Sequence, residues 1–184
     1  MFRKLSVILV IGLLAFTAAC SSKSSSTNAA SATGAAASVA ATSTPAACPT
    51  KNTESFAKTK FVADVAIAGG AFKRYIYTPA KDGKFKKGAN GRVLAFVKAA
   101  AAGALTVNRL EAAKTAAQAN PTLCKLLAEP IARFSAAVSG LIGKAKGGSI
   151  DPSDVDSASG YLSGLHGAAS QGGAAFTDNT NTSA

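Results

Sequence analysis

Apolar side chains recur at steps of three and four residues between about residues 52 and 170 of this chain, and no segment there alternates strictly between apolar and polar positions. Steps of three and four place side chains on one face of an α-helix, whereas a half-buried strand would alternate. The stretch from Cys48 to Ser170 is long enough for one small domain and too short for two. The pattern therefore predicts a single all-α domain over residues 48–170.

Glycine, proline and capping residues divide this domain into about four helices. The expected helices cover about residues 53–77, 92–119, 121–146 and 152–170. Asn52 or Thr53 is expected to cap the first helix, which ends before Thr78-Pro79. Asp151 is expected to cap the fourth. Four helices with short turns favour an antiparallel bundle, and three long helices with a loosely docked fourth would give the same pattern.

Each expected helix carries a stripe of apolar side chains that would face the core. The predicted core residues are Phe61, Val62, Val65, Ala68, Phe72, Tyr75 and Ile76 in the first helix, Phe96, Ala100, Gly103, Val107 and Leu110 in the second, Leu123, Leu127, Ile131, Phe134, Val138, Leu141 and Ala145 in the third, and Val155, Ala158, Leu162, Leu165 and Ala169 in the fourth. The second helix also contains an apolar run from Val93 to Val107. Lys98 interrupts this run, and its length of about 15 residues is short for the roughly 20 that a bilayer core requires. A buried bundle helix is therefore favoured over a membrane span.

The first 20 residues have the organisation of an export signal. A short cationic start is followed by Leu5–Phe16, whose 12-residue length is typical of the apolar core of a signal peptide. The stretch ends in Thr17-Ala18-Ala19-Cys20, which resembles the lipobox of bacterial lipoproteins. The resemblance implies that residues 1–19 are removed, that the Cys20 thiol is diacylated, and that the chain is anchored at the extracytoplasmic face of the cell membrane.

Two alternatives stay open for this segment. Thr17 stands where lipoproteins most often have an aliphatic residue such as Leu, and cleavage without lipidation would give a secreted protein. An uncleaved N-terminal anchor is the other alternative, but 12 residues are short for a spanning helix. Two acyl chains would anchor the protein stably, because each buried methylene contributes about 0.8 kcal/mol.

Residues 20–47 and 171–184 are predicted to be disordered. Between Ser21 and Ala47 the chain is almost entirely Ser, Ala and Thr, with Val39 as its one large aliphatic residue. Such a composition cannot bury enough apolar area to offset chain entropy, so we expect a flexible tether. Tethers of this composition resemble those of actinobacterial lipoproteins. The segment from Gln171 to Ala184 is likewise predicted to be a disordered tail.

The chain has three cysteines. Once Cys20 carries lipid, Cys48 and Cys124 are left as an even pair in an oxidising compartment, which favours a disulfide. The topology supports the same pairing, because the starts of the first and third helices lie at the same end of an up-and-down bundle. The alternative is two unpaired buried thiols.

Residue types that carry catalysis or bind metals are sparse. His166 is the single histidine, and it is interpreted as a structural residue. The acids Asp151, Asp154 and Asp156 lack the glycine and the distal glutamate of a calcium-binding EF-hand loop, so they are interpreted as helix-start residues that complement the helix dipole. We therefore predict a non-enzymatic protein with no catalytic residue, no metal site and no cofactor.

Positive charge is the feature of the sequence that points to a binding function. The whole chain carries a formal charge of +11, and residues 51–98 contain eleven Lys and Arg against three acids. Aromatic residues (Tyr75, Tyr77 and Phe85) lie among these cations and could contact apolar surfaces while the charges meet an anion. The candidate anion-binding residues are Lys73, Arg74, Lys81, Lys84, Lys86, Lys87 and Arg92.

The predicted location outside the cell membrane limits the kinds of partner that this basic region can meet. An anionic phospholipid, a phosphate-bearing wall polymer or an acidic protein would suit it, whereas nucleic acid is not expected outside the cell membrane. A solvated lysine-rich turn that only keeps the domain soluble is the plainer interpretation. A second functional hypothesis is a helical protein-interaction module that acts as an accessory or inhibitory factor for another exported protein.

Overall fold

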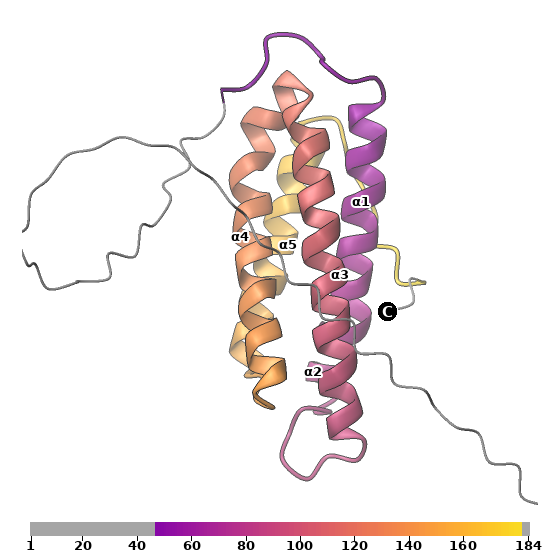
Figure 1. Ribbon diagram of the computed structural model, residues 1–184, viewed down its shortest axis with the longest axis vertical. Coiled ribbons are helices and arrows are strands. Elements are labelled where there is room, and N and C mark those ends of the chain that lie inside the picture. The colour runs from indigo at the N-terminus through magenta and orange to yellow at the C-terminus, as the bar shows by residue number, and fades with distance from the viewer. Residues whose placement is uncertain (1–46, 182–184) are drawn as a thin grey trace, which may run out of the picture. The chain divides into compact units, whose positions relative to one another are not determined.

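The computed structural model describes residues 47–181, which form an antiparallel bundle of four long helices (Figure 1). The helices are α1 (Ala57–Phe72), a π-helical turn η1 (Lys73–Tyr77), the short α2 (Thr78–Lys81), α3 (Arg92–Gln118), α4 (Pro121–Lys146) and α5 (Pro152–Gln171). No strand occurs in this range. The predicted signal peptide, Cys20 and nearly all of the tether lie outside the described residues. The all-α prediction is confirmed.

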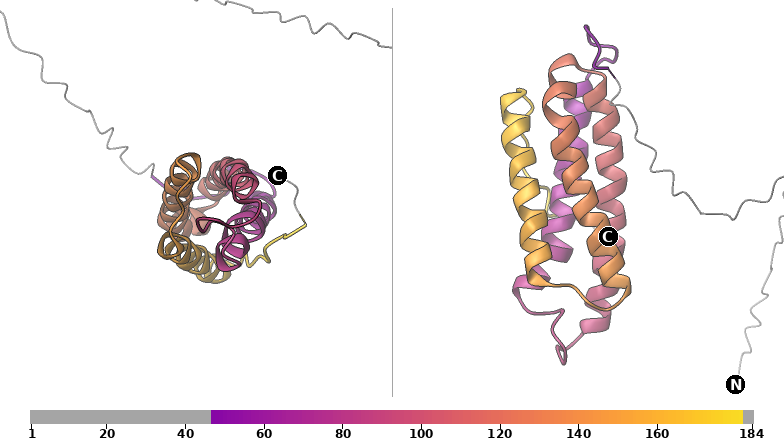
Figure 2. Two further views of the ribbon diagram at one scale, coloured as in Figure 1. Left: turned by 90° about the horizontal axis from the view of Figure 1, so that it is seen from below. Right: turned by 90° about the vertical axis from the view of Figure 1, so that its left-hand side faces the viewer.

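The helices are arranged so that α1 packs on α3, α3 on α4, and α4 on α5, as the end-on view of Figure 2 shows. The predicted core stripes of α4 and α5 are buried in full. The fourth long helix is therefore an integral part of the bundle. Among residues 47–181, the hydrophobic core cluster runs from Phe61 to Ala174, so this segment has a core of its own.

The start of α4 shows how local sequence sets a helix end. Asn120 has extended backbone dihedrals, and its side-chain oxygen accepts hydrogen bonds from the backbone N–H groups of Thr122 and Leu123, both at 3.0 Å. These bonds satisfy two of the amides that a helix start leaves without partners. The Asn120 amide donates at 2.8 Å to the side chain of Asn52, which ties the turn between α3 and α4 to the segment before α1.

One predicted cap is wrong, and the other is confirmed in its position only. The first helix begins at Ala57 and not at Asn52 or Thr53, because those residues bond to the turn between α3 and α4. The Thr53 N–H donates to the Ala119 carbonyl at 3.0 Å. Asp151 does occupy the N-cap position of α5, but its side chain makes no capping hydrogen bond and lies 3.5 Å from Lys144 Nζ.

The predicted end of the first helix is also wrong, because the chain stays helical through Pro79 as far as Lys81. The proline lacks an N–H, and in a regular α-helix its ring would clash with the carbonyl four residues earlier. Here the turn just before it is widened to a π-helix, in which the Thr78 N–H bonds to the Lys73 carbonyl, five residues back. The wider turn gives the proline ring room without ending the helix.

The predicted disulfide is confirmed, with Cys48 and Cys124 joined and their Cα atoms 5.7 Å apart. It fastens the segment before α1 to the first turn of α4. The bond closes a loop with a sequence separation of 76. A loop of this length stabilises the folded state by about 4 kcal/mol on the chain-entropy model.

The prediction of a disordered tail is wrong for residues 172–181, which pack along the seam between α1 and α5; residues 182–184 lie outside the described range. Phe176 lies edge-on to Phe61 of α1 and stacks on His166 of α5, at centroid distances of 6.4 and 3.9 Å. The Asn179 N–H donates to the Ala66 carbonyl at 2.8 Å. Figure 1 shows this segment running back beside α1.

A pair of glycines in α1 makes room for the tail. A Cβ atom built on Gly69 would lie 2.0 Å from the Asp178 carboxylate, and one on Gly70 would lie 1.7 Å from the Asn179 carbonyl oxygen. Both distances are far shorter than a van der Waals contact, so any side chain at these positions would displace the tail. Two residues that weaken the helix intrinsically therefore form the floor of a groove.

Replacing both cysteines, as Cys48→Ser with Cys124→Ser, should lower the free energy of unfolding by about 4 kcal/mol, because the unfolded chain regains the freedom of the closed loop. Urea unfolding followed by helical circular dichroism measures this. A loss below about 1 kcal/mol would show that the disulfide does not restrict the unfolded chain as described.

Gly70→Ala should destabilise the domain by about 1–3 kcal/mol through overpacking and should release the tail, seen as faster hydrogen exchange at the Asn179 amide. Gly164→Ala is the matched control, since Gly164 is also helical and a Cβ there meets nothing within 4 Å. The control should leave exchange in the tail unchanged and stabilise the domain by up to about 1 kcal/mol. Equal behaviour of the two variants would contradict the steric role of Gly70.

Candidate anion-binding site

The loop of residues 82–91 joins α2 to α3 and closes one end of the bundle (Figure 1). Its path depends on Gly83, Gly88 and Gly91, whose φ angles of 70°, 84° and 72° are readily adopted only by glycine. Backbone hydrogen bonds hold the loop, among them the one from the Lys84 N–H to the Pro79 carbonyl at 2.9 Å. The loop therefore has a defined shape although it contains no regular helix.

Phe85 fastens the loop to the core. Its side chain is only 6% exposed and lies against Phe96 of α3, with a centroid distance of 5.0 Å and an interplanar angle of 30°. The prediction that Phe85 contacts a ligand between the cations is therefore wrong. The aromatic ring anchors the loop, and the cations on either side of it face outward.

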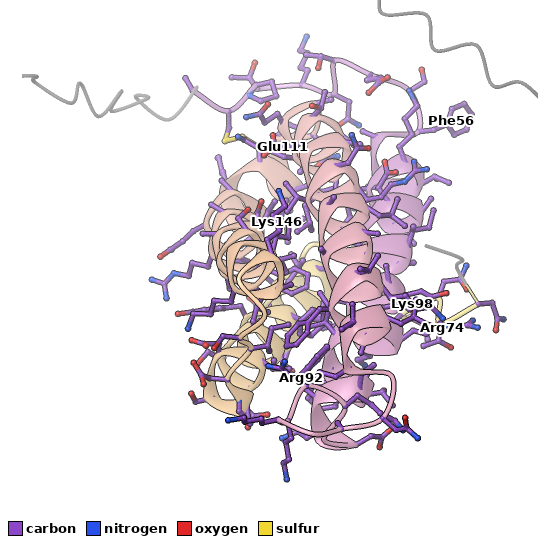
Figure 3. All side chains as sticks on the ribbon, turned by 60° about the horizontal axis from the view of Figure 1, so that its bottom comes forward. Phe56, Arg74, Arg92, Lys98, Glu111 and Lys146 are labelled. Carbon is purple, nitrogen blue, oxygen red and sulfur yellow. A yellow bond between two sulfur atoms is a disulfide. The ribbon has the colours of Figure 1, made fainter. Side chains whose placement is uncertain are left out.

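Arg92 acts as a clamp and not as a free cation. It donates hydrogen bonds from Nε to the Phe85 carbonyl at 3.0 Å and from an Nη atom to the Gly148 carbonyl at 2.6 Å. Its guanidinium group also lies 4.7 Å from the centroid of the Phe96 ring. These contacts join the loop, the start of α3 and the connection between α4 and α5, near the Arg92 label in Figure 3.

Lys84, Lys86 and Lys87, which we call the loop lysines, are exposed. Within residues 47–181 they have no side-chain hydrogen bond and no acidic partner. The other predicted anion-binding residues are engaged elsewhere. Lys73 pairs with Asp178 at 2.6 Å, and Arg74 donates to the Thr180 carbonyl at 2.8 Å, so both belong to the groove that holds the tail.

Lys81 borders the loop but has an acidic partner. Its ammonium group donates a hydrogen bond to Asp156 of α5, and this bond, helped by the nearby negative charge of the same carboxylate, raises the pKa of Lys81. The structure thus divides the seven predicted anion-binding residues into three groups. Lys73 and Arg74 bind the tail, Lys81 and Arg92 have partners at the edge of the loop, and the three loop lysines are exposed without acidic partners.

An apolar group that was not predicted is exposed at the same end of the bundle as the loop lysines. Val93, Leu94 and Val97, which we call the α3 wedge, are 77%, 57% and 60% exposed. They were expected to belong to a buried helix, but the core face of α3 is made by Phe96, Ala99 and residues at the same helical positions further along. A helical wheel places the α3 wedge opposite that face, which is the signal that could have revealed it.

Length and composition alone would let two of the described helices, α3 and α4, cross a membrane. Both pack in the bundle, where α3 buries Leu110 and α4 buries Phe134 completely. Only 33% of the apolar stretch of α3 and 28% of that of α4 is buried, so the core accounts for part of their apolar character.

Other clusters of polar side chains have structural partners. His166 shares the Asp178 carboxylate, 3.1 Å away, with Lys73. Asp154 pairs with Lys144, and the hydrogen bond from Lys144 to Asp154 raises the pKa of this lysine. In the described part of the chain, no group of three or more His, Cys, Asp or Glu side chains is placed to hold a metal ion.

Comparison with known proteins finds no match to any family model, curated protein or solved structure.

Proposed function

We propose that this protein is an exported lipoprotein, anchored through Cys20, whose helical domain binds anionic components of the cell envelope or membrane surface and catalyses no reaction. The observation that carries the proposal is the set of three exposed loop lysines that lack acidic partners on a loop of defined shape. Cations that no acid neutralises create a positive potential that attracts polyanions.

The loop lysines stand out by their clustering. Within residues 47–181, Lys51, Lys98, Lys125 and Lys146 also lack an acidic partner, but they lie apart from one another, whereas the loop lysines all fall within residues 84–87. Other exposed cations are paired with acids, as in Lys60–Glu54, Lys114–Glu111 and Arg133–Glu129. No acid occurs in the sequence between Asp82 and Glu111.

The reach of the predicted tether is compatible with binding to the membrane that holds the anchor. Cys48 lies at the opposite end of the bundle from the loop, and α3, with 27 residues, separates the two ends by about 40 Å. The 27 residues from Ser21 to Ala47 span at most about 90 Å. The tether is therefore long enough for the loop to face either the membrane or the wall.

Reversing the loop lysines, as Lys84→Glu, Lys86→Glu and Lys87→Glu, should weaken binding to phosphatidylglycerol vesicles and to polyphosphate on the order of 100-fold, because each basic residue near an anionic surface contributes about 1 kcal/mol. Binding of the unaltered domain should weaken as salt is raised, because salt screens exposed charges. The measurement uses residues 20–184 with Cys20→Ser, whose described part contains its own core and disulfide.

The control carries Lys51→Glu, Lys114→Glu and Lys125→Glu, three exposed lysines outside the loop. It changes the net charge by the same amount and should keep most of the binding. Equal losses in the two variants would mean that only net charge matters. Retention of one specific protein, indifferent to salt and to the loop lysines, would replace the proposal by the protein-interaction module.

Cys20→Ser in the full-length chain should abolish incorporation of labelled palmitate and move the protein from the membrane fraction to the medium, because serine cannot form the thioether. Cys48→Ser with Cys124→Ser is the control and should keep the label. Persistent membrane attachment of the Cys20→Ser variant would indicate an uncleaved N-terminal anchor instead.

A further inference from the structure

The α3 wedge and the loop lysines are exposed at the same end of the bundle, which gives that end both apolar and cationic character. We infer that its ligand is an anionic lipid bilayer, into whose interface Val93, Leu94 and Val97 insert while the loop lysines and Lys98 meet the headgroups. The inference rests on the proposed function and specifies its partner.

The clustering of the wedge is the first observation behind this inference. Among the described residues five large apolar side chains are exposed, and three of them fall within residues 93–97. Val93 and Val97 are one helical turn apart, as are Leu94 and Val97, so the three share one side of α3. Single exposed apolar residues are common on protein surfaces, whereas a contiguous group at the end of a helix marks a contact surface.

The charge around the wedge is the second observation. The loop lysines precede it in the chain, and Lys98, also exposed, follows it on α3 (Figure 3). Arg92 fixes the loop against the first turn of α3 through its bond to the Phe85 carbonyl. Cations are therefore held at the same end of the bundle as the exposed apolar side chains.

An anionic bilayer can neutralise the lysines and also bury the exposed apolar side chains. A wall polymer or another soluble polyanion would neutralise the lysines but leave Val93, Leu94 and Val97 in water. A second copy of the chain could cover the apolar side chains, but it would bring two sets of unneutralised lysines together. Amphipathic surfaces with cations beside apolar residues bind anionic membranes by combining headgroup attraction with shallow burial.

The insertion is shallow because only the first turns of α3 are free to enter. From Ala99 onward the opposite side of this helix is committed to the core through residues such as Gly103 and Leu110. A Cβ atom on Gly103 would lie 2.5 Å from Ile142 of α4, which shows how closely the two helices pack. The bundle thus presents the wedge without unfolding, and α3 does not span the membrane.

The chain contains no tryptophan, so a single introduced one reports its own environment. In residues 20–184 with Cys20→Ser, Val97→Trp should show a blue-shifted emission on adding phosphatidylglycerol vesicles and strong quenching by lipids with brominated acyl chains. Phe56→Trp is the control, because Phe56 is 78% exposed at the opposite end of the bundle. It should show neither change.

A second variant separates insertion from charge. This triple variant carries Val93→Gln, Leu94→Gln and Val97→Gln, and glutamine is a good helix former. Its binding to phosphatidylglycerol vesicles should be weaker on the order of 100-fold, which is the size expected from losing three partly buried aliphatic side chains. Binding of this variant to polyphosphate should be unchanged. The charge-reversed loop variant should lose both.

The outcomes distinguish the two proposals. If the glutamine variant binds vesicles as the unaltered domain does, or if the tryptophan of the Val97→Trp variant is not quenched while vesicles are bound, insertion is overturned and anion binding stands. If the unaltered domain binds neither vesicles nor polyphosphate, the proposed function fails as well. If the emission of the Val97→Trp variant shifts with protein concentration in the absence of vesicles, the wedge is an interface between copies of the chain and insertion is overturned.

Discussion

A helix in a four-helix bundle can bury only part of its circumference, and α3 carries apolar side chains on two opposite sides. The inner side consists largely of alanine and glycine, and it lets α3 lie close to both α1 and α4, as the near contact of Gly103 with Ile142 shows. The outer side of its first turns has no neighbouring helix, and Val93, Leu94 and Val97 are exposed there.

The basic loop is held where the outer side of α3 begins. Phe85 is buried against Phe96, and Arg92 joins the loop backbone to the connection between α4 and α5. The side chains that flank Phe85 are left outside, and these are the loop lysines. One buried ring and one guanidinium group thus bring the cations to the apolar end of α3, and neither group is available to a ligand.

The core side of a helix could be predicted where its large apolar residues form one regular stripe. In α4, Leu127, Phe134 and Leu141 recur every seven residues, and all are buried as predicted. In α3 the predicted stripe is correct at Phe96, Gly103 and Leu110, which are buried. Alanine surrounds these residues, and the prediction chose the half-buried Ala100 and Val107 where Ala99 and Thr106 are buried. A stripe without contrast does not reveal which side faces the core.

The docking of the tail and the pairing of Lys73 and Arg74 depend on tertiary contacts that the sequence did not indicate. The tail has a composition typical of disorder, yet Phe176 packs against Phe61 of α1, and Asp178 and Asn179 lie against Gly69 and Gly70 of the same helix. The same groove uses Lys73 and Arg74, which the sequence placed with the loop lysines. Pairing across elements removed these cations from the candidate site, and nothing local in the sequence indicated it.

The measurement that tests this account most directly is hydrogen exchange across the whole domain with and without phosphatidylglycerol vesicles. Loop amides exchange readily unless a surface covers them, so the account predicts slower exchange over residues 83–94 and unchanged exchange in the tail and in residues 47–56. Protection confined to the tail groove or to the disulfide end, with the loop unaffected, would contradict the assignment of the basic, apolar end of α3 as the binding surface.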